Sequence, residues 1–556
     1  MRRRRGAANS LYVFMGGSIV VLAALGFLLY RMGSPRTGLN GEASLVVYCA
    51  AGMKEPMESI ARQYQDEFGV PIQLQYGGSN TLLNQIEVSK TGDLFLAADS
   101  SYIDLARDKG LAAERLSMAQ IRPVIAVAKG NDAIRSVADL LKPGVKIAMG
   151  NPDAAAVGKK TKKLLEKTGQ WESLQQAVTE RGTFSPTVNE VATAVEIGSV
   201  DAGIVWDSTV AMFDKLEAIH VPEFDSGVST IEIAVLENAS DPTAALRFAR
   251  FAAARDRGLT TFDKMGFDVV EGDQWSEHPE LTFFAGSVNR RALEPIINEF
   301  QQREGVTINA IYNGCGILTA QMRSLKESKQ AGFPDTYMAC DRYYLDTVQE
   351  MFEKGVDISD TDIVIVVQKG NPKNIQSLED LAGEGLKIAI GQPDQCTIGV
   401  LSRRLLESAD LYEKLFDVGN IATQAPTSAM LVPSVAIGTV DAALAYTTDT
   451  LAEADKVEAI RIDSPLAKAV QPFSVSLSSP HKQLGHRLLE RIRASRDSFE
   501  SAGFNWRLDL AGTSGEANDP FGDDDPANDE PAGDQPTGDQ PTGDQQADDA
   551  QAARDE

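Results

Sequence analysis

The sequence predicts two tandem α/β domains, each built around a mainly parallel β-sheet. Residues 45–82 align without a gap with residues 281–318, and Gly78 matches Gly314 in this alignment. Within each copy, short apolar segments alternate with amphipathic helical patterns, which is typical of a parallel sheet. The chain has 556 residues, so each copy is long enough to form a domain with its own core.

The elements of the first copy follow in a regular order. Runs of β-branched and other apolar residues predict strands, and each of the first three runs leads into small residues and then a helical pattern. The expected strands are residues 45–48, 72–76, 94–96, 124–128, 147–149, 203–206 and 231–236. The expected helices are residues 56–68, a segment from residue 82, and residues 102–109.

The second copy repeats later landmarks of the first. The sequence Lys-Gly-Asn occurs at 129–131 and again at 369–371, and Lys-Ile-Ala at 146–148 recurs at 387–389. We therefore predict one domain over residues 43–278 and a second, diverged domain over residues 279–512.

The N-terminus predicts a membrane anchor. Arg2 to Arg5 precede an unbroken apolar run over residues 11–30, which is long enough to cross a bilayer as a helix. The arginines place residues 1–10 in the cytoplasm. A cleaved signal peptide is the alternative. In both cases the linker at 31–42 leads to domains outside the cytoplasm, in the periplasm or an equivalent extracytoplasmic space.

The C-terminal segment, residues 513–556, is predicted to be a disordered acidic tail, because its Pro, Gly, Asp and Gln residues show no periodicity. It carries about half of the net charge of −26. This acidic balance argues against nucleic acid as a partner.

The loops after the first three strands suit an anion. They contain small residues, hydroxyl groups and the expected beginnings of helices, where backbone N–H groups are free. The four histidines lie elsewhere, and the sequence has no zinc-ligand spacing, phosphate-binding loop or nucleophile elbow. Glycine and serine are also ordinary turn residues. The sequence therefore predicts a binding protein rather than an enzyme.

Five segments in order, residues 49–57, 69–86, 92–104, 146–158 and 188–210, resemble the molybdate-binding periplasmic proteins of ABC transporters. The resemblance covers residues 45 to about 275 and returns, weaker, from 281 to about 510. It implies the type II periplasmic binding fold, in which two α/β lobes joined by crossing strands close over a tetrahedral oxyanion. It also implies an ABC transporter permease as partner.

The resemblance implies ligand-binding positions in the first domain. They supply hydroxyl groups, backbone amides or an indole N–H, and they are Gly52, Ser79, Asn80, Ala98, Val157, Val188 and Trp206. Gly52 stands where the family usually has a serine, and Trp206 where it usually has a tyrosine. A site lined only by donors suits a fully deprotonated oxyanion such as molybdate, tungstate or sulfate. The resemblance implies molybdate or tungstate as cargo, and we expect no cofactor.

The second domain changes these positions. Its corresponding residues are Cys315, Cys340, Ile398, Ser428 and Tyr446, and Cys396 lies two residues before Ile398. Three interpretations remain open for the cysteines Cys315, Cys340 and Cys396: buried inert thiols, a disulfide between two of them, or a thiolate site for a soft metal or metalloid.

Together these features predict a membrane-anchored extracytoplasmic protein that binds a small oxyanion for an ABC transporter. The alternative is a ligand-sensing or scaffolding module whose ligand has changed, with a soft metal or metalloid in the second domain.

Overall fold

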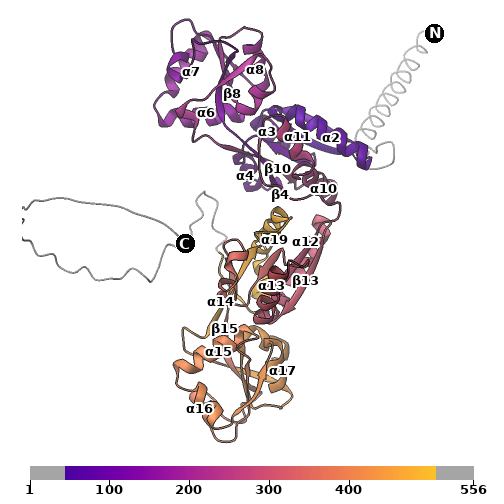
Figure 1. Ribbon diagram of the computed structural model, residues 1–556, viewed down its shortest axis with the longest axis vertical. Coiled ribbons are helices and arrows are strands. Elements are labelled where there is room, and N and C mark those ends of the chain that lie inside the picture. Colours follow the sequence, from indigo (N-terminus) through magenta and orange to yellow (C-terminus); the bar gives the residue numbers. More distant parts are fainter. Residues whose placement is uncertain (1–43, 509–556) are drawn as a thin grey trace, which may run out of the picture. The chain divides into compact units, whose positions relative to one another are not determined.

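The structure, a computed structural model, describes residues 44–508 (Figure 1). The expected anchor at 11–30 and the expected tail at 513–556 lie outside these residues. Within residues 44–508, no helix is both long and apolar enough to cross a membrane.

The first lobe of the first copy contains a six-stranded sheet in the order β11-β4-β10-β3-β1-β2. Its strands are β1 (Leu45–Ala50), β2 (Ile72–Gly77), β3 (Leu94–Ala97), β4 (Ala112–Ile121), β10 (Ser229–Leu236) and β11 (Asp268–Val269). Its helices are α2 (Lys54–Phe68), α3 (Ser79–Ser89), α4 (Ser101–Asp108), α10 (Pro242–Ala252) and α11 (Gly258–Lys264).

The second lobe of this copy contains a five-stranded sheet in the order β7-β6-β8-β5-β9. Its strands are β5 (Pro123–Ala128), β6 (Ile147–Gly150), β7 (Thr183–Ser185), β8 (Ala202–Trp206) and β9 (Leu216–Ile219). Its helices are α5 (Val137–Leu140), α6 (Ala156–Lys167), α7 (Trp171–Arg181), α8 (Val188–Glu196) and α9 (Asp207–Ala211), and α6, α7 and α8 are drawn around β8 in Figure 1.

The expected strands and helices of the first copy are all present, but the sheets are mixed rather than mainly parallel. β1 pairs in parallel with β2 and β3, whereas β10 pairs antiparallel with both β3 and β4. The cause is the path of the chain, which leaves the first lobe after β4 and returns along β10. A returning strand runs opposite to those it joins.

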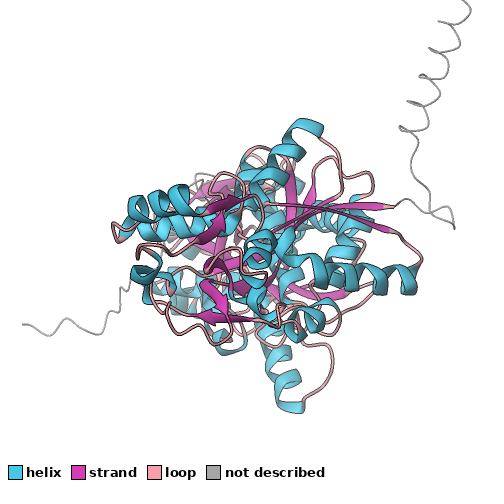
Figure 2. Cartoon of the chain, turned by 90° about the horizontal axis from the view of Figure 1, so that it is seen from above, coloured by secondary structure: helices cyan, strands magenta, loops and turns pink. Residues whose placement is uncertain are grey.

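The second copy contains a ten-stranded arrangement. Figure 2 shows helices and strands mixed throughout the described part of the chain. Its strands are β12 (Glu280–Gly286), β13 (Thr307–Asn313), β14 (Thr336–Met338), β15 (Val356–Gln368), β16 (Ile388–Gly391), β17 (Ile421–Ala425), β18 (Ala442–Tyr446), β19 (Val457–Arg461), β20 (Lys468–Val475) and β21 (Asn505–Trp506). Its helices are α12 (Arg290–Glu304), α13 (Cys315–Ser328), α14 (Arg342–Asp346), α15 (Thr397–Ser408), α16 (Tyr412–Asp417), α17 (Leu431–Ala436), α18 (Thr447–Thr450), α19 (Lys482–Arg493) and α20 (Arg496–Ser501).

Pro123 explains why the first copy has two separate sheets and the second copy has one connected sheet. Pro123 pairs with Trp206, and Ile363 pairs with Tyr446 at the equivalent place in the second copy. The Ile363 N–H donates to the carbonyl of Ala467 at 2.8 Å, a bond that proline cannot make. The first copy therefore divides this segment into β4 and β5, whereas β15 continues through both lobes.

Each copy has its own hydrophobic core. Helix α2 shows how the sequence builds it: Met57, Ile60 and Tyr64 recur every three or four residues and are buried. The helix ends at Gly69, whose φ of 76° is accessible to glycine at little cost. Helix α12 of the second copy ends in the same way at Gly305, with φ of 67°.

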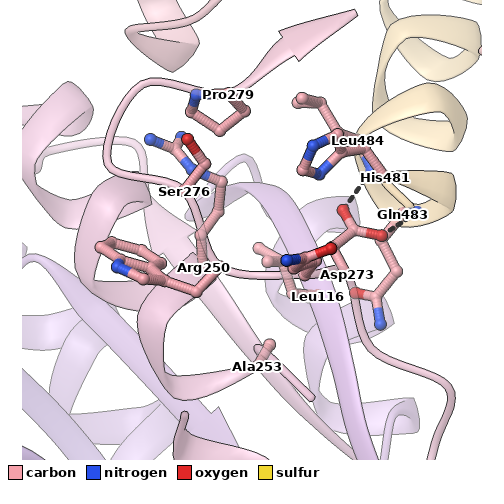
Figure 3. Close-up of a pocket in the computed structure, with 11 residues that line it drawn as sticks. Leu116, Arg250, Ala253, Asp273, Ser276, Pro279, His481, Gln483 and Leu484 are labelled. Atoms are coloured by element: carbon pink, nitrogen blue, oxygen red, sulfur yellow. Dashed lines mark hydrogen bonds between the residues drawn. The ribbon is translucent and has the colours of Figure 1, made fainter. Parts of the chain in front are cut away.

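Polar contacts join the two copies. The carboxylate of Glu304 is fully buried and accepts hydrogen bonds from Arg487 at 2.7 Å and from Arg250 of the first copy at 3.1 Å. Figure 3 shows a neighbouring small pocket, in which the Asp273 carboxylate accepts the N–H groups of Gln483 and Leu484. Asp273 thereby caps the beginning of α19.

Candidate functional site

A small cavity of about 20 Å³ lies between the two lobes of the first copy. It is lined by small and apolar residues from both sheets, with no charged side chain among them. The lining residues are Ala50, Ala51, Gly52, Gly77, Gly78, Ser79, Ala98, Ala155, Ala156, Val157, Thr187, Val188 and Trp206. The space accommodates at least a water molecule, and because both lobes enclose it, a ligand must enter while the lobes are apart.

Three helices begin at this cavity. Helix α3 begins at Ser79, α6 at Ala156 and α8 at Val188. The first N–H groups of a helix have no partner within it, and the helix dipole places partial positive charge at this end. The cavity therefore attracts an anion without any lysine or arginine in its lining.

The Ser79 hydroxyl is oriented by the next loop. Ser79 is buried, and its Oγ accepts the N–H of Ala98 at 3.2 Å. A hydroxyl group has one donor hydrogen besides its acceptor lone pairs. Because the amide occupies an acceptor position, the Ser79 O–H remains available to donate to a ligand.

A threonine that the sequence reasoning missed lies beside Gly52. A Cβ atom at Gly52 would be 3.2 Å from Val188 Cγ1, 3.8 Å from Trp206 Cδ1 and 4.0 Å from Thr209 Oγ1. The Thr209 hydroxyl is buried and has no hydrogen-bond partner among residues 44–508. Thr209 is not among the residues that line the cavity, but its hydroxyl lies next to the position where Gly52 has no side chain.

The structure brings most of the predicted residues together. Gly52, Ser79, Ala98, Val157, Val188 and Trp206 all line the cavity. Asn80 is not in the lining, because its side chain donates to the carbonyl of Asp153 at 2.6 Å. Thr187 also lines the cavity and was not predicted. It caps the beginning of α8, and a threonine at that position is common in helices without any binding role.

Hydrogen bonds connect the lobes across this cavity. The Asn80 N–H donates to the Ala154 carbonyl at 3.1 Å, and the Asn189 amide donates to the Ala51 carbonyl at 2.9 Å. The Lys160 ammonium group lies 2.8 Å from the Asp99 carboxylate. The structure thus shows the lobes in contact, with polar groups of one lobe bound to the other.

Asp99 is charged in this arrangement. Burial raises the pKa of its carboxyl group, but hydrogen bonds from Lys160, Ser101 and Ser229 outweigh burial and lower the pKa below its ordinary value. The carboxylate is therefore ionised at neutral pH and paired across the two lobes with Lys160.

Gly78 permits this close contact. A Cβ atom at Gly78 would lie 2.4 Å from the Ala154 carbonyl oxygen and 2.7 Å from that of Pro186, both in the second lobe. Gly314 has the same role in the second copy, where a Cβ atom would lie 2.5 Å from the Gln395 carbonyl oxygen.

Comparison with known proteins identifies the family. The family model described as bacterial extracellular solute-binding protein matches residues 45–268 and again 281–505. The chain belongs to this family, with its domain present twice. Solute-binding proteins are not enzymes, which confirms the prediction of a binding protein rather than an enzyme.

The relatives also confirm the resemblance to the molybdate-binding proteins. The molybdate-binding protein ModA of Mycobacterium tuberculosis is 30% identical over 238 residues, which are 42% of this chain and 88% of that protein. ModA of Escherichia coli is 27% identical, over 37% of this chain and 82% of that protein. Among solved structures, the periplasmic molybdate-binding protein of Azotobacter vinelandii shares 17% identity and a TM-score of 0.36, over 40% of this chain and 98% of that chain.

The second solute-binding domain places different side chains at the equivalent positions. Cys315, Cys340, Ile398, Ser428 and Tyr446 are all buried. The Cys340 N–H donates to Cys315 Sγ at 3.1 Å, as the Ala98 N–H does to Ser79. The two thiol sulfurs are 2.8 Å apart.

Cys396 does not join this pair. Its thiol donates to the backbone carbonyls of Gln392 at 3.5 Å and Ala425 at 3.4 Å, and burial raises its pKa to about 11. Residues 44–508 contain no group of three or more His, Cys, Asp and Glu side chains arranged to hold a metal ion. Of the three cysteines, Cys315 and Cys340 are thus the two whose sulfurs are in contact.

Proposed function

We propose that the first solute-binding domain binds a small, fully deprotonated tetrahedral oxyanion, molybdate or tungstate, between its lobes. The observation that supports this is a cavity with neutral donors and no charged side chain, surrounded by the beginnings of three helices. Ser79 and Thr209 would donate hydroxyl hydrogens, and the first amides of α6 and α8 would donate backbone N–H groups.

This donor set favours some oxyanions over others. Monohydrogen phosphate carries a proton that needs an acceptor, and no carboxylate occurs among the lining residues. A buried group without its hydrogen-bond partner costs about 1–3 kcal/mol. The site should therefore bind molybdate or tungstate about 5- to 150-fold more tightly than monohydrogen phosphate.

The ligand would act by stabilising contact between the lobes. An anion held by both lobes adds to the bonds that Asn80, Asn189 and Lys160 already make across the cavity. Binding would shift the population toward the closed state, which an ABC transporter permease would recognise. The apolar segment at 11–30 would anchor the protein beside that permease.

Calorimetric titration of the protein with molybdate, tungstate, sulfate and phosphate tests the proposal. The expected result is binding of molybdate or tungstate that a Ser79→Ala substitution weakens strongly. Absence of binding to any of the four anions, together with an unchanged melting temperature, would contradict it.

A second function, sensing or scaffolding, is favoured by one observation: the second domain keeps the fold but replaces the Ser79 hydroxyl with the Cys315 thiol. A domain kept for cargo delivery alone would be expected to keep the donor set of the first.

A further inference from the structure

The two domains carry different residues at three equivalent positions that lie close together. The strand pairs of the copies align Ala50 with Gly286, and the loops align Ser79 with Cys315 and Ala98 with Cys340. In the first domain these positions lie side by side in the lining of the cavity.

The glycine in the second domain makes room for the two cysteine side chains. A Cβ atom at Gly286 would lie 2.1 Å from Cys340 Sγ and 2.8 Å from Cys315 Sγ. An alanine at this position, as in the first domain, would overlap both thiols. Gly286 therefore provides the space that the cysteine pair occupies, and the three positions behave as a unit rather than as independent substitutions.

The paired sulfurs are unsuited to the ligand proposed for the first domain. A thiol is a weak hydrogen-bond donor compared with a hydroxyl group. Here the Ser79 donor is replaced by a sulfur atom that faces a second sulfur at 2.8 Å. Cys315 also begins α13, and thiolates are stabilised at the beginnings of helices.

A second observation indicates a ligand. The Tyr446 hydroxyl, equivalent to the Trp206 ring that lines the first cavity, is buried and has no hydrogen-bond partner among residues 44–508. Several buried polar groups among residues 44–508 lack a partner, and Tyr446 is one that stands at a position equivalent to the lining of the first cavity. A ligand complex between the lobes would give this hydroxyl a charged neighbour.

We propose that the second domain binds a soft monovalent cation, Cu(I) or its analogue Ag(I), through the sulfurs of Cys315 and Cys340. Thiolates select soft ions, and two sulfur ligands satisfy a two-coordinate d10 cation. Zn(II) would require four ligands, which the described residues do not group here. The inference concerns the second domain and does not depend on oxyanion binding by the first.

The binding step is a ligand exchange without redox change. Each thiol releases its proton to solvent as its sulfur binds the ion, which gives a complex of one cation and two thiolates with one net negative charge. The sulfurs must move apart from 2.8 Å to admit the ion, and both lie in the interior of the domain, so entry requires the lobes to open.

The experiment is native mass spectrometry of the full-length protein, reduced and kept without oxygen, with Ag(I) or with Cu(I) in the presence of a competing Cu(I) chelator. We expect one ion per chain. Substitution Cys315→Ser or Cys340→Ser should weaken retention by more than about 100-fold, since loss of an outer-shell partner alone weakens metal sites 10- to 100-fold. Cys49→Ser and Cys396→Ser, at buried cysteines outside the pair, are the matched controls and should retain the ion.

Circular dichroism and oxyanion titration of each variant separate misfolding from loss of the site, and they report on the first domain independently. Retention of the ion by both Cys315→Ser and Cys340→Ser, or no ion on the reduced protein, would overturn the proposal. A Cys315–Cys340 disulfide that persists under reductant would overturn it as well.

Discussion

Replacing Gly78 with alanine is expected to keep the lobes of the first domain apart while leaving each lobe folded. The new Cβ atom would meet carbonyl oxygens of Ala154 and Pro186 at 2.4 and 2.7 Å, where ordinary contact begins at 3.4 Å. Both oxygens belong to the backbone, which cannot rotate away as a side chain can. The lobes must therefore separate locally by roughly 1 Å.

The expected cost follows from this overlap. Insertion of one carbon atom into a closely packed contact destabilises it by about 1–3 kcal/mol. The penalty applies only to the closed state, so the apparent affinity for an oxyanion should fall by about 5- to 150-fold. The melting temperature without ligand should fall by less than this penalty implies, because the lobes can open and so avoid the new methyl group.

Two assays measure the effect. Calorimetric titration with molybdate reports the affinity, and hydrogen exchange of the Asn80 amide, which donates to the Ala154 carbonyl across the cavity, reports closure without ligand. Gly77→Ala is the matched control for closure, measured by hydrogen exchange, since its Cβ would meet only the flexible Leu82 side chain of its own lobe at 3.0 Å. Gly77 lines the cavity, so this control is not used for the affinity. Wild-type affinity and a protected Asn80 amide in Gly78→Ala would refute the reasoning.

Three further outcomes are expected. Ser79→Ala should weaken oxyanion binding at least about 10-fold and leave a backbone N–H unpaired at a cost of about 1–3 kcal/mol, measured by calorimetry and denaturant unfolding. Glu304→Gln should destabilise the chain by about 3–5 kcal/mol in denaturant unfolding, because two buried arginines lose their counter-charge; an unchanged midpoint would contradict this. The pKa of Asp99 is lowered in the folded state, so its pairing with Lys160 stabilises the fold fully above the ordinary pKa of 3.8. This stabilisation is lost as the pH falls through the lower pKa of the folded state. Melting-temperature profiles against pH should show that Asp99→Asn abolishes this loss.

The repeat made the fold predictable. A gap-free match over the first two strands places Ser79 and Cys315 at equivalent positions, and the structure gives them equivalent amide hydrogen bonds. The two positions remain equivalent although the helix that follows Gly314 is longer than the one that follows Gly78: α13 has 14 residues and α3 has 11. Local pattern suffices here because strand ends and helix starts fix the loop between them.

Features that depend on long-range contact could not be predicted. The Thr209 hydroxyl reaches the neighbourhood of Gly52 from the other lobe, and only the folded chain shows this. Asn80 was among the expected ligand-binding residues, and the structure shows its side chain donating to the Asp153 carbonyl, because a helix turns successive side chains in different directions. Cys396 was grouped with Cys315 and Cys340, but its thiol donates to the backbone carbonyls of Gln392 and Ala425.

The central claim is that the first domain binds a tetrahedral oxyanion through neutral donors. Calorimetric titration of the full-length protein with molybdate, compared with Ser79→Ala, tests it most directly. The account predicts one molybdate per chain at micromolar affinity or tighter, with binding lost or strongly weakened in the variant. Absence of heat with molybdate and tungstate, or equal affinity in the Ser79→Ala variant, would contradict it.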